Sequence, residues 1–154
     1  MVKIKIISIG SKSDKNIAAL IDGYIKKMSN QFNIKWVNIK AEKKFDSIGQ
    51  KKEFEANKIK SYIQDSYVIA MDENGKTFNS KGFAFEITKW AQNFSNLTFI
   101  IGGADGLDKS ILANANFIFS LSEMTFPHQL VKLLLSEQLY RSSAILSNHP
   151  YHRE

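Results

Sequence analysis

Hydrophobic and polar residues alternate along this chain in two recurring patterns, which predict strands and helices in turn. Short apolar runs predict strands at residues 2–9, 34–39, 67–71, 97–103 and 116–122. Apolar residues spaced three and four apart predict helices at residues 14–28, 53–63, 81–94, 107–115 and 127–146. Strands that alternate with helices five times predict an α/β fold, with a mostly parallel sheet of five to six strands and helices on both of its faces.

Local signals add detail to several of these elements. Asp14 is a good capping residue for the first helix, whose apolar stripe consists of Ile17, Leu20, Ile21, Tyr24 and Ile25. In the helix at 53–63 we expect the inward-facing residues to be Phe54, Ile59, Tyr62 and Ile63. The polar stretches 11–15, 41–50 and 72–80 show no such periodicity and are predicted as loops.

The helix at 127–146 is the longest, and Pro127 suits its first turn. Its apolar side chains cover an unusually wide part of its surface: Leu130, Val131, Leu134, Leu135, Leu139 and Ile145. Such coverage is typical either of a helix at the centre of the core or of one that forms half of a dimer contact.

Composition limits the class of protein. The 154 residues, 44% of them hydrophobic, predict a single globular domain at 1–154. The absence of cysteine excludes disulfides and thiolate metal ligands. No apolar run approaches the roughly 20 residues that a membrane span needs, and the first residues lack the cleavage site of a signal peptide. We therefore expect a soluble, cytoplasmic protein that does not bind membranes.

The net charge of +6 is unevenly distributed. Residues 1–77 hold 15 lysines and 9 acidic residues, whereas residues 78–154 hold six basic and six acidic residues. Lysines gather in one stretch: Lys40, Lys43, Lys44, Lys51 and Lys52. A basic face of this kind attracts nucleic-acid phosphates, although a lysine surface that only keeps the protein soluble has the same composition.

In parallel α/β sheets ligands bind beyond the carboxyl ends of the strands, so the strand exits are the first places to look for chemistry. The fourth predicted strand ends in the sequence IIGGADG at 100–106, where three glycines allow the backbone to approach a ligand closely. A tight turn without a ligand has the same glycines. The fifth strand leads through SEMTFP to His128, where the helix N-terminus favours a neutral imidazole or a simple capping role. Asp72 and Glu73 follow the third strand, but no histidine lies near them and we expect no metal site.

The chain closes with NHPYHRE at 148–154, which holds two of its three histidines. Chain ends are usually poorly ordered, so this concentration of versatile polar groups is unexpected. If the last helix packs on a partner subunit, the segment can be held against that partner and become ordered there.

Three stretches carry a resemblance to a known family: IGGADG, SLSEMTFPHQLVKLLLSEQLYR and NHPYHRE. Together they resemble the bacterial ribosomal RNA large-subunit methyltransferase H family, which belongs to the SPOUT class, and the similarity covers essentially the whole chain. The resemblance implies a homodimeric enzyme that uses S-adenosyl-L-methionine to methylate N3 of a pseudouridine in 23S rRNA on the assembled ribosome. It also implies a C-terminal trefoil knot, with the knot and the cofactor site in roughly 70–154.

The same resemblance implies roles for individual residues. The cofactor-binding positions of the family correspond here to Met71, Gly103, Ser122, Glu123, Met124, Thr125, Phe126 and Pro127. In the tail the resemblance implies an RNA-facing wall formed by His149, Tyr151, His152 and Arg153. A neutral histidine there is a candidate acceptor for the N3 proton, although solvent or a phosphate also serves; the tyrosine suits stacking and the arginine a phosphate.

Two alternatives remain at this point. A non-catalytic nucleotide-binding module associated with the ribosome explains the charge and the glycine turn but gives the tail no task. A flavodoxin-like redox protein has the same alternation of strands and helices, and it predicts a yellow colour on purification.

Overall fold

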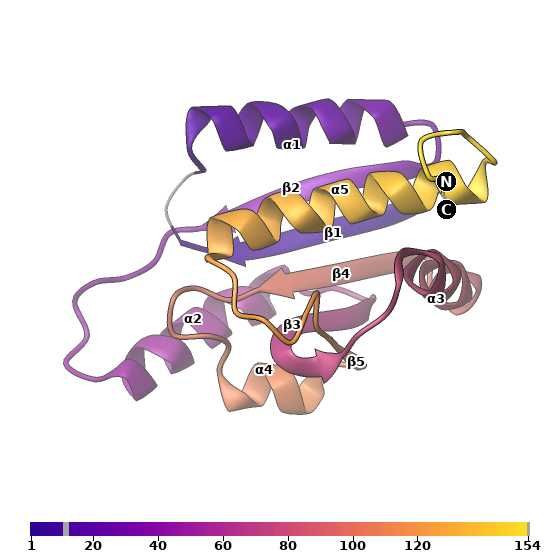
Figure 1. The fold of residues 1–154 in the computed structure, drawn as a ribbon. Helices are drawn as coiled ribbons and strands as arrows, with labels where there is room; N and C mark the ends of the chain where they lie inside the picture. The colour runs from indigo at the N-terminus through magenta and orange to yellow at the C-terminus, as the bar shows by residue number, and fades with distance from the viewer. Residues whose placement is uncertain (11–12, 154) are drawn as a thin grey trace.

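The computed structural model describes residues 1–10 and 13–153. Its centre is one five-stranded sheet in the order β2-β1-β4-β3-β5, in which all paired strands run parallel (Figure 1). The strands are β1 (Val2–Ile9), β2 (Phe32–Ile39), β3 (Tyr67–Lys76), β4 (Asn96–Ile101) and β5 (Phe117–Phe119). The helices are α1 (Lys15–Met28), α2 (Ile48–Tyr62), α3 (Ser80–Asn93), α4 (Lys109–Asn114) and α5 (His128–Leu146). The predicted α/β class, the parallel sheet and the number of elements are confirmed.

Helices cover both faces of the sheet, as predicted. One face packs against α1, α3 and α5 through a core that includes Ile6, Phe99, Phe83 and Leu135. The other face packs against α2 and α4 through a smaller core, for which Ile7, Ile100, Ile59 and Ile111 are representative. Both β1 and β4 are paired on both sides, and residues 6–9 of β1 and 97–101 of β4 are buried without interruption, as is typical of parallel strands covered on both faces.

The helix starts follow from their capping residues. Asp14 caps α1 by accepting a hydrogen bond of 2.8 Å from the Asn16 backbone N–H, as predicted from the sequence. Ser47 caps α2 in the same way, with its hydroxyl 3.1 Å from the Gln50 backbone nitrogen. The helix therefore begins at Ile48 and not at residue 53, and the last part of the stretch predicted as a loop is helical.

Further predictions need correction. The strand β3 does not end at Met71 but runs on to Lys76, because after a register shift Lys76 pairs with Phe119 of β5. Leu20 is 52% exposed and Tyr62 is 44% exposed, so neither belongs to the core. Ser11 and Lys12 of the loop predicted at 11–15, and Glu154 of the tail, lie outside the described residues.

The sequence left open whether the apolar surface of α5 belongs to the core or to a dimer contact, and the position of the helix shows that it belongs to the core. The helix packs between α1 and α3, and Leu135, Leu139 and Tyr140 are buried there. It is therefore central to the core, while Leu130 and Leu146 remain exposed. Within the described part of the chain, no helix has the length and apolar character to cross a membrane.

Candidate active site

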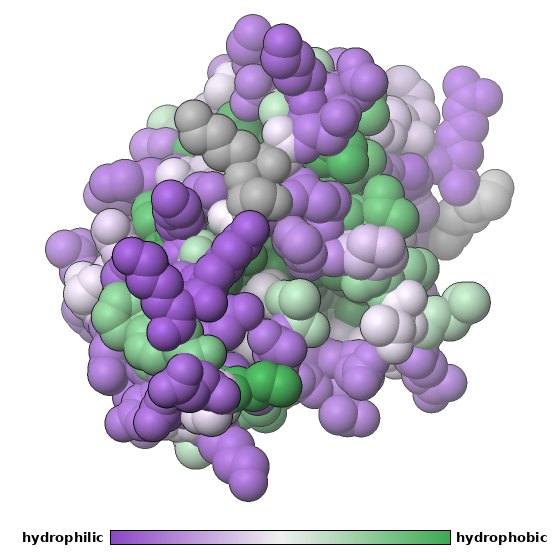
Figure 2. Space-filling model, turned by 90° about the vertical axis from the view of Figure 1, so that its left-hand side faces the viewer, coloured by the Kyte–Doolittle hydropathy of each residue, from purple (hydrophilic) through white to green (hydrophobic). Residues whose placement is uncertain are grey.

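A cavity of about 760 Å³ lies at the carboxyl ends of the central strands. Residues 71–73 of β3, the exits of β4 and β5 and the first turn of α5 form its walls, so it occupies the position that the α/β rule selects. Figure 2 shows the end of the molecule to which the strands point, where hydrophilic side chains surround smaller hydrophobic areas. The volume of the cavity falls within the range of about 300–1,000 Å³ that small-molecule and cofactor sites occupy.

The glycine turn after β4 supplies one wall of this cavity. A Cβ atom added to Gly103 would lie 3.3 Å from Cγ2 of Ile9, so a larger side chain would push against the end of β1. The turn is closed by a hydrogen bond of 3.1 Å from the Gly106 N–H to the Gly103 carbonyl, and Gly106 has a left-handed φ of 78°. Three of the turn residues that line the cavity, Gly102, Gly103 and Gly106, are glycines and leave their backbone uncovered by a side chain of their own.

The loop between β5 and α5 supplies the opposite wall and is held by its own polar side chains. The Ser120 hydroxyl donates to the Ser122 carbonyl over 2.6 Å, and the Ser122 hydroxyl accepts from the Met124 N–H over 3.0 Å. The Thr125 hydroxyl donates to Oε2 of Glu73 over 2.7 Å. This last contact ties the loop to β3 and connects two walls of the cavity.

His128 lines the cavity at the start of α5 and lies close to Gly10, the residue after β1. A Cβ atom on Gly10, whose φ is 136°, would lie 3.1 Å from the Nε2 atom of His128. Burial lowers the pKa of His128, and the nearby charge of Lys132 lowers it further. Lys132 is only 2% exposed, and burial lowers its pKa as well. The imidazole is therefore held in its neutral form near pH 7, as expected for a helix N-terminus.

The cofactor positions that the resemblance implied are brought together here. Seven of the eight line this one cavity: Met71, Gly103, Ser122, Met124, Thr125, Phe126 and Pro127. Glu123 belongs to the same loop but is exposed and does not line the cavity. Among the described residues, no group of three or more His, Cys, Asp or Glu side chains is arranged to hold a metal ion.

The C-terminal tail turns back on α5 through a Schellman motif. Asn148 adopts the left-handed conformation, with a φ of 56°. The His149 N–H donates to the Ala144 carbonyl over 2.8 Å, and the Asn148 N–H donates to the Ile145 carbonyl over 3.2 Å. These are the two bonds that define the motif, and they reverse the chain at the end of the helix.

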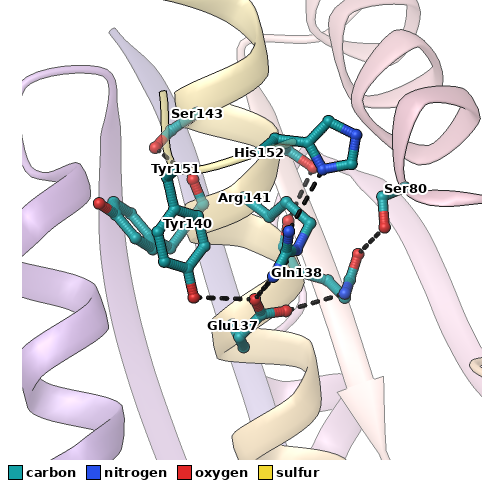
Figure 3. Close-up of polar contacts among 9 residues, drawn as sticks. Ser80, Glu137, Gln138, Tyr140, Arg141, Ser143, Tyr151 and His152 are labelled. Atoms are coloured by element: carbon teal, nitrogen blue, oxygen red, sulfur yellow. Dashed lines mark hydrogen bonds and ion pairs between the residues drawn. The ribbon is translucent and has the colours of Figure 1, made fainter. Parts of the chain in front are cut away.

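Side chains then hold the reversed tail against α5 (Figure 3). The Tyr151 hydroxyl donates to Oε1 of Glu137 over 3.0 Å, and the rings of Tyr151 and Tyr140 lie 4.4 Å apart. The Arg141 guanidinium donates to the same carboxylate oxygen from Nε over 3.0 Å and also from Nη2. Arg141 lies 4.8 Å from the centre of the Tyr151 ring and contacts Nδ1 of His152 over 3.2 Å. Burial, followed by hydrogen bonding to Tyr24 and Glu137, raises the pKa of Tyr151.

Glu137 is a member of this cluster that the sequence reasoning missed. The sequence does contain a signal for it. Glu137 and Arg141 lie four residues apart on one predicted helix, which is the spacing of a side-chain ion pair. Gln138 extends the cluster, because its amide donates to Glu137 over 2.8 Å and accepts from the Ser80 hydroxyl over 2.8 Å. The tail is thereby linked to the start of α3.

The cavity and the tail lie at opposite ends of α5. The helix of 19 residues is about 28 Å long, with His128 at its cavity end and the Schellman motif at the other. Both chain termini lie at the end of the molecule away from the start of α5 (Figure 1). Of the described tail residues, none lines this cavity. The structure thus brings the predicted cofactor residues together and the predicted tail residues together, but keeps the two groups apart.

Comparison with known proteins places the chain among methyltransferases. A family model described as a predicted SPOUT methyltransferase matches residues 2–152. The chain is 43% identical over 154 residues to the ribosomal RNA large subunit methyltransferase H of Acholeplasma laidlawii, with 99% of this chain and 100% of the relative covered. The protein of the same name from Methylobacillus flagellatus is 36% identical over 155 residues, with the same coverage.

A solved structure agrees at the level of the fold. The structure of a probable methylase family protein from Haemophilus influenzae superposes with a TM-score of 0.54 at 12% sequence identity, covering 98% of this chain and 70% of that one. The full-length matches in sequence show more than a shared fold. The chain belongs to the SPOUT methyltransferases and, within them, to the ribosomal RNA large subunit methyltransferase H family.

Proposed function

We propose that this protein is a homodimeric S-adenosyl-L-methionine-dependent methyltransferase that modifies N3 of a pseudouridine in 23S rRNA on the assembled bacterial ribosome. The observation that carries the proposal is the match over the full chain to relatives named ribosomal RNA large subunit methyltransferase H. Their name supports the ribosomal substrate, and the cavity at the strand exits supplies a site of suitable size for the cofactor.

The residues around the cavity fit this cofactor. The backbone of the glycine turn is exposed to the cavity, and a Cβ at Gly103 would narrow the space beside Ile9. Exposed backbone N–H and C=O groups of this kind suit an adenine edge, while Met71 and Phe126 offer apolar contacts. When bound, the cofactor would supply an activated methyl group, and the protein's task is to align it with the acceptor nitrogen.

We propose that the tail of one protomer completes the site of the other. The tail is ordered on α5 but lies about one helix length from the cavity of its own chain. The exposed Leu130 and Leu146 at the two ends of α5 offer apolar surface for a second copy. An arrangement of two copies about a two-fold axis would place each tail beside the cavity of the partner. It would account for the distance of the tail from its own cavity and for the exposed leucines.

In this arrangement the tail would face the RNA. Arg153 is exposed and available for a phosphate. The Tyr151 ring packs against Tyr140 and Arg141, so we propose that it holds the tail in place beside the RNA. The lysine-rich half of the chain would add contacts to the phosphate backbone, which position the protein without reading sequence. A trefoil knot in the C-terminal part, at about 70–154, is a further element of the proposal and would hold the cavity loops in place.

One experiment tests the whole proposal. Mass spectrometry of 23S rRNA from cells that lack the gene should show the loss of one methyl group from one pseudouridine, and the purified protein should restore it with S-adenosyl-L-methionine. The rival, a non-catalytic ribosome-associated module, predicts unchanged rRNA and no heat of binding in a calorimetric titration with the cofactor. Membership of a methyltransferase family leaves the redox alternative without support.

A further inference from the structure

We propose that His152 and His149 act as fixed N–H donors toward the carbonyl oxygens that flank N3 of the target base, and not as acceptors of its proton. This inference rests on the proposed function for the position of the base. It assigns the hydrogen position on each ring from contacts that the ring makes with this protein, one with α5 and one within the tail.

The contact of His152 with Arg141 decides which ring nitrogen carries the proton. Nη1 of Arg141 lies 3.2 Å from Nδ1 of His152. A guanidinium has only donors and stays charged in proteins, so Nδ1 has to be the acceptor and carries no hydrogen. In the neutral ring the hydrogen then sits on Nε2, which faces away from Arg141 (Figure 3).

Arg141 is itself held in place, so this contact is not an accident of a mobile side chain. Its Nε and Nη2 atoms both donate to Oε1 of Glu137, and its guanidinium lies over the ring of Tyr151. Glu137 is in turn fixed by Tyr151 and Gln138. The third donor group of Arg141 is thereby aimed at Nδ1 of His152.

His149 is assigned the same form by an independent contact. The backbone N–H of Tyr151 lies 3.2 Å from its Nδ1 atom. A backbone N–H only donates, so this nitrogen is again the acceptor and Nε2 again carries the hydrogen. Both rings therefore have their acceptor nitrogen occupied by a donor of this protein, and in each ring Nε2 is left as the donor.

This arrangement matches the chemistry of a uracil-type ring. N3 lies between two carbonyl oxygens, and when its proton is lost the negative charge spreads onto them. In the reaction the N3–H bond breaks and its proton passes to solvent water. The N3–C bond forms as the bond between the methyl carbon and sulfur breaks, and the electron pair stays on sulfur. Donors aimed at a flanking oxygen stabilise the charge that develops there, as in an oxyanion hole.

The same donors would also select the base. A cytosine-type ring carries an amino donor next to its N3, so an N–H group there would face another donor and leave both unpaired. Uracil-type rings offer an acceptor instead. A site built to donate rejects a base that lacks the acceptor more strongly than an apolar site does. The tail histidines would thus contribute to specificity as well as to rate.

The ring forms are tested first, without RNA. Two-bond hydrogen–nitrogen correlation spectra of nitrogen-15-labelled protein near pH 7.5 distinguish the two neutral tautomers and the charged ring. We expect both tail histidines to show the form with hydrogen on Nε2. A hydrogen on Nδ1, or a charged ring, at His152 would overturn the proposal whatever the enzyme methylates.

Paired substitutions then separate donor from acceptor. In His152→Gln the side-chain amide places an N–H group near the position of Nε2 but accepts no proton, whereas in His152→Asn the amide lies near Nδ1. We expect methylation of ribosomes by His152→Gln to stay within about tenfold of wild type and that of His152→Asn to fall about 100-fold, the typical cost of removing one donor. Cofactor affinity, measured by calorimetry, should be unchanged in both.

Two results would count against the proposal in different ways. Equal losses in the Gln and Asn variants, with cofactor affinity intact, would show that the ring accepts the proton. Wild-type protein that methylates no pseudouridine would instead refute the proposed function and leave the ring assignment standing.

Discussion

Tyr151 and Glu137 are joined by a hydrogen bond of 3.0 Å, although Tyr151 lies in the C-terminal tail and Glu137 in the middle of α5. The same Glu137 oxygen accepts from Arg141, so one carboxylate anchors both the tail and the arginine that contacts His152. Glu137 therefore connects the tail to α5 beyond the Schellman motif.

Glu137→Gln should therefore weaken methylation without weakening cofactor binding. The amide keeps one acceptor oxygen but loses the charge that holds Arg141, and hydrogen bonds to charged groups contribute about 1.5–3 kcal/mol. We expect kcat on ribosomes to fall about tenfold or more, with the calorimetric affinity for S-adenosyl-L-methionine unchanged. Glu53→Gln, an exposed position on α2, is the matched control. A variant at Glu137 with wild-type kcat would show that the anchor is dispensable.

Asn148 offers a test of the chain reversal itself. Its left-handed φ of 56° is a conformation that glycine adopts freely and that a β-branched residue resists. Asn148→Gly should keep the tail in place and retain activity, whereas Asn148→Val should cost about 1–2 kcal/mol at this turn and reduce methylation. Limited proteolysis of the last residues gives a direct readout. Equal protection of the tail in both variants would argue against the motif as its cause.

Gly103→Val should abolish cofactor binding. The added Cβ would lie 3.3 Å from Ile9, and the two further methyl groups would have to fit into a turn that lines the cavity. Isothermal calorimetry with S-adenosyl-L-methionine measures the loss, and circular dichroism checks that the fold is kept. Gly23→Ala is the matched control, because no atom lies within 4 Å of a Cβ at that helical position. Wild-type affinity in the Val variant would refute the assignment of the cavity.

Only some of the lysines near α2 can be replaced without disturbing the cavity. Lys51 forms an ion pair of 3.1 Å with Asp105 and Lys52 lines the cavity, so replacing them would disturb the site itself. The variant Lys40→Ala/Lys43→Ala/Lys44→Ala leaves both in place. We expect it to bind ribosomes more weakly and to lower the slope of log K against log salt by about 0.7–0.9 for each phosphate that is no longer neutralised. Lys89→Ala on α3 should leave the slope unchanged, and an unchanged slope in the triple variant would exclude this face.

His128 should make the protein less stable in acid. Burial lowers its pKa in the folded state, whereas the unfolded chain binds a proton near the ordinary value of about 6.5. Below about pH 6.5 the unfolded state therefore holds more protons, so the free energy of unfolding falls as the pH is lowered through this window. Urea unfolding from about pH 5 to pH 8 should show a shallower dependence in His128→Gln. Parallel curves for the two proteins would show that the ring titrates normally.

Much of the fold was predictable because its signals are local. Asp14, the apolar spacing of α1 and the buried runs of β1 and β4 each identify an element without reference to the rest of the chain. The start of α2 was missed although Ser47 and Gln50 have the spacing of a capping box, because the surrounding residues are polar.

Other features depend on contacts between distant residues and leave no local signal. The extension of β3 comes from its pairing with β5, where a Cβ on Gly75 would lie 2.7 Å from the Phe119 carbonyl carbon. The burial of Lys132 and the exposure of Tyr62 likewise follow from which helix covers which part of the sheet. The residues of the cavity were named from a family resemblance, and residue patterns by themselves indicated only the strand exits that bring them together.

The strand order has a consequence for how the protein is made. The first strand, β1, lies in the interior of the sheet between β2 and β4, and β4 begins only at Asn96. A nascent chain can therefore pair β1 with β2 early, but the other edge of β1 stays open until nearly two thirds of the polypeptide has been synthesised. The side of the sheet that α5 covers is completed later still, because α5 follows β4 and β5 in the chain. Chaperones that shield open strand edges should accordingly engage this protein during its synthesis, and truncated products should aggregate.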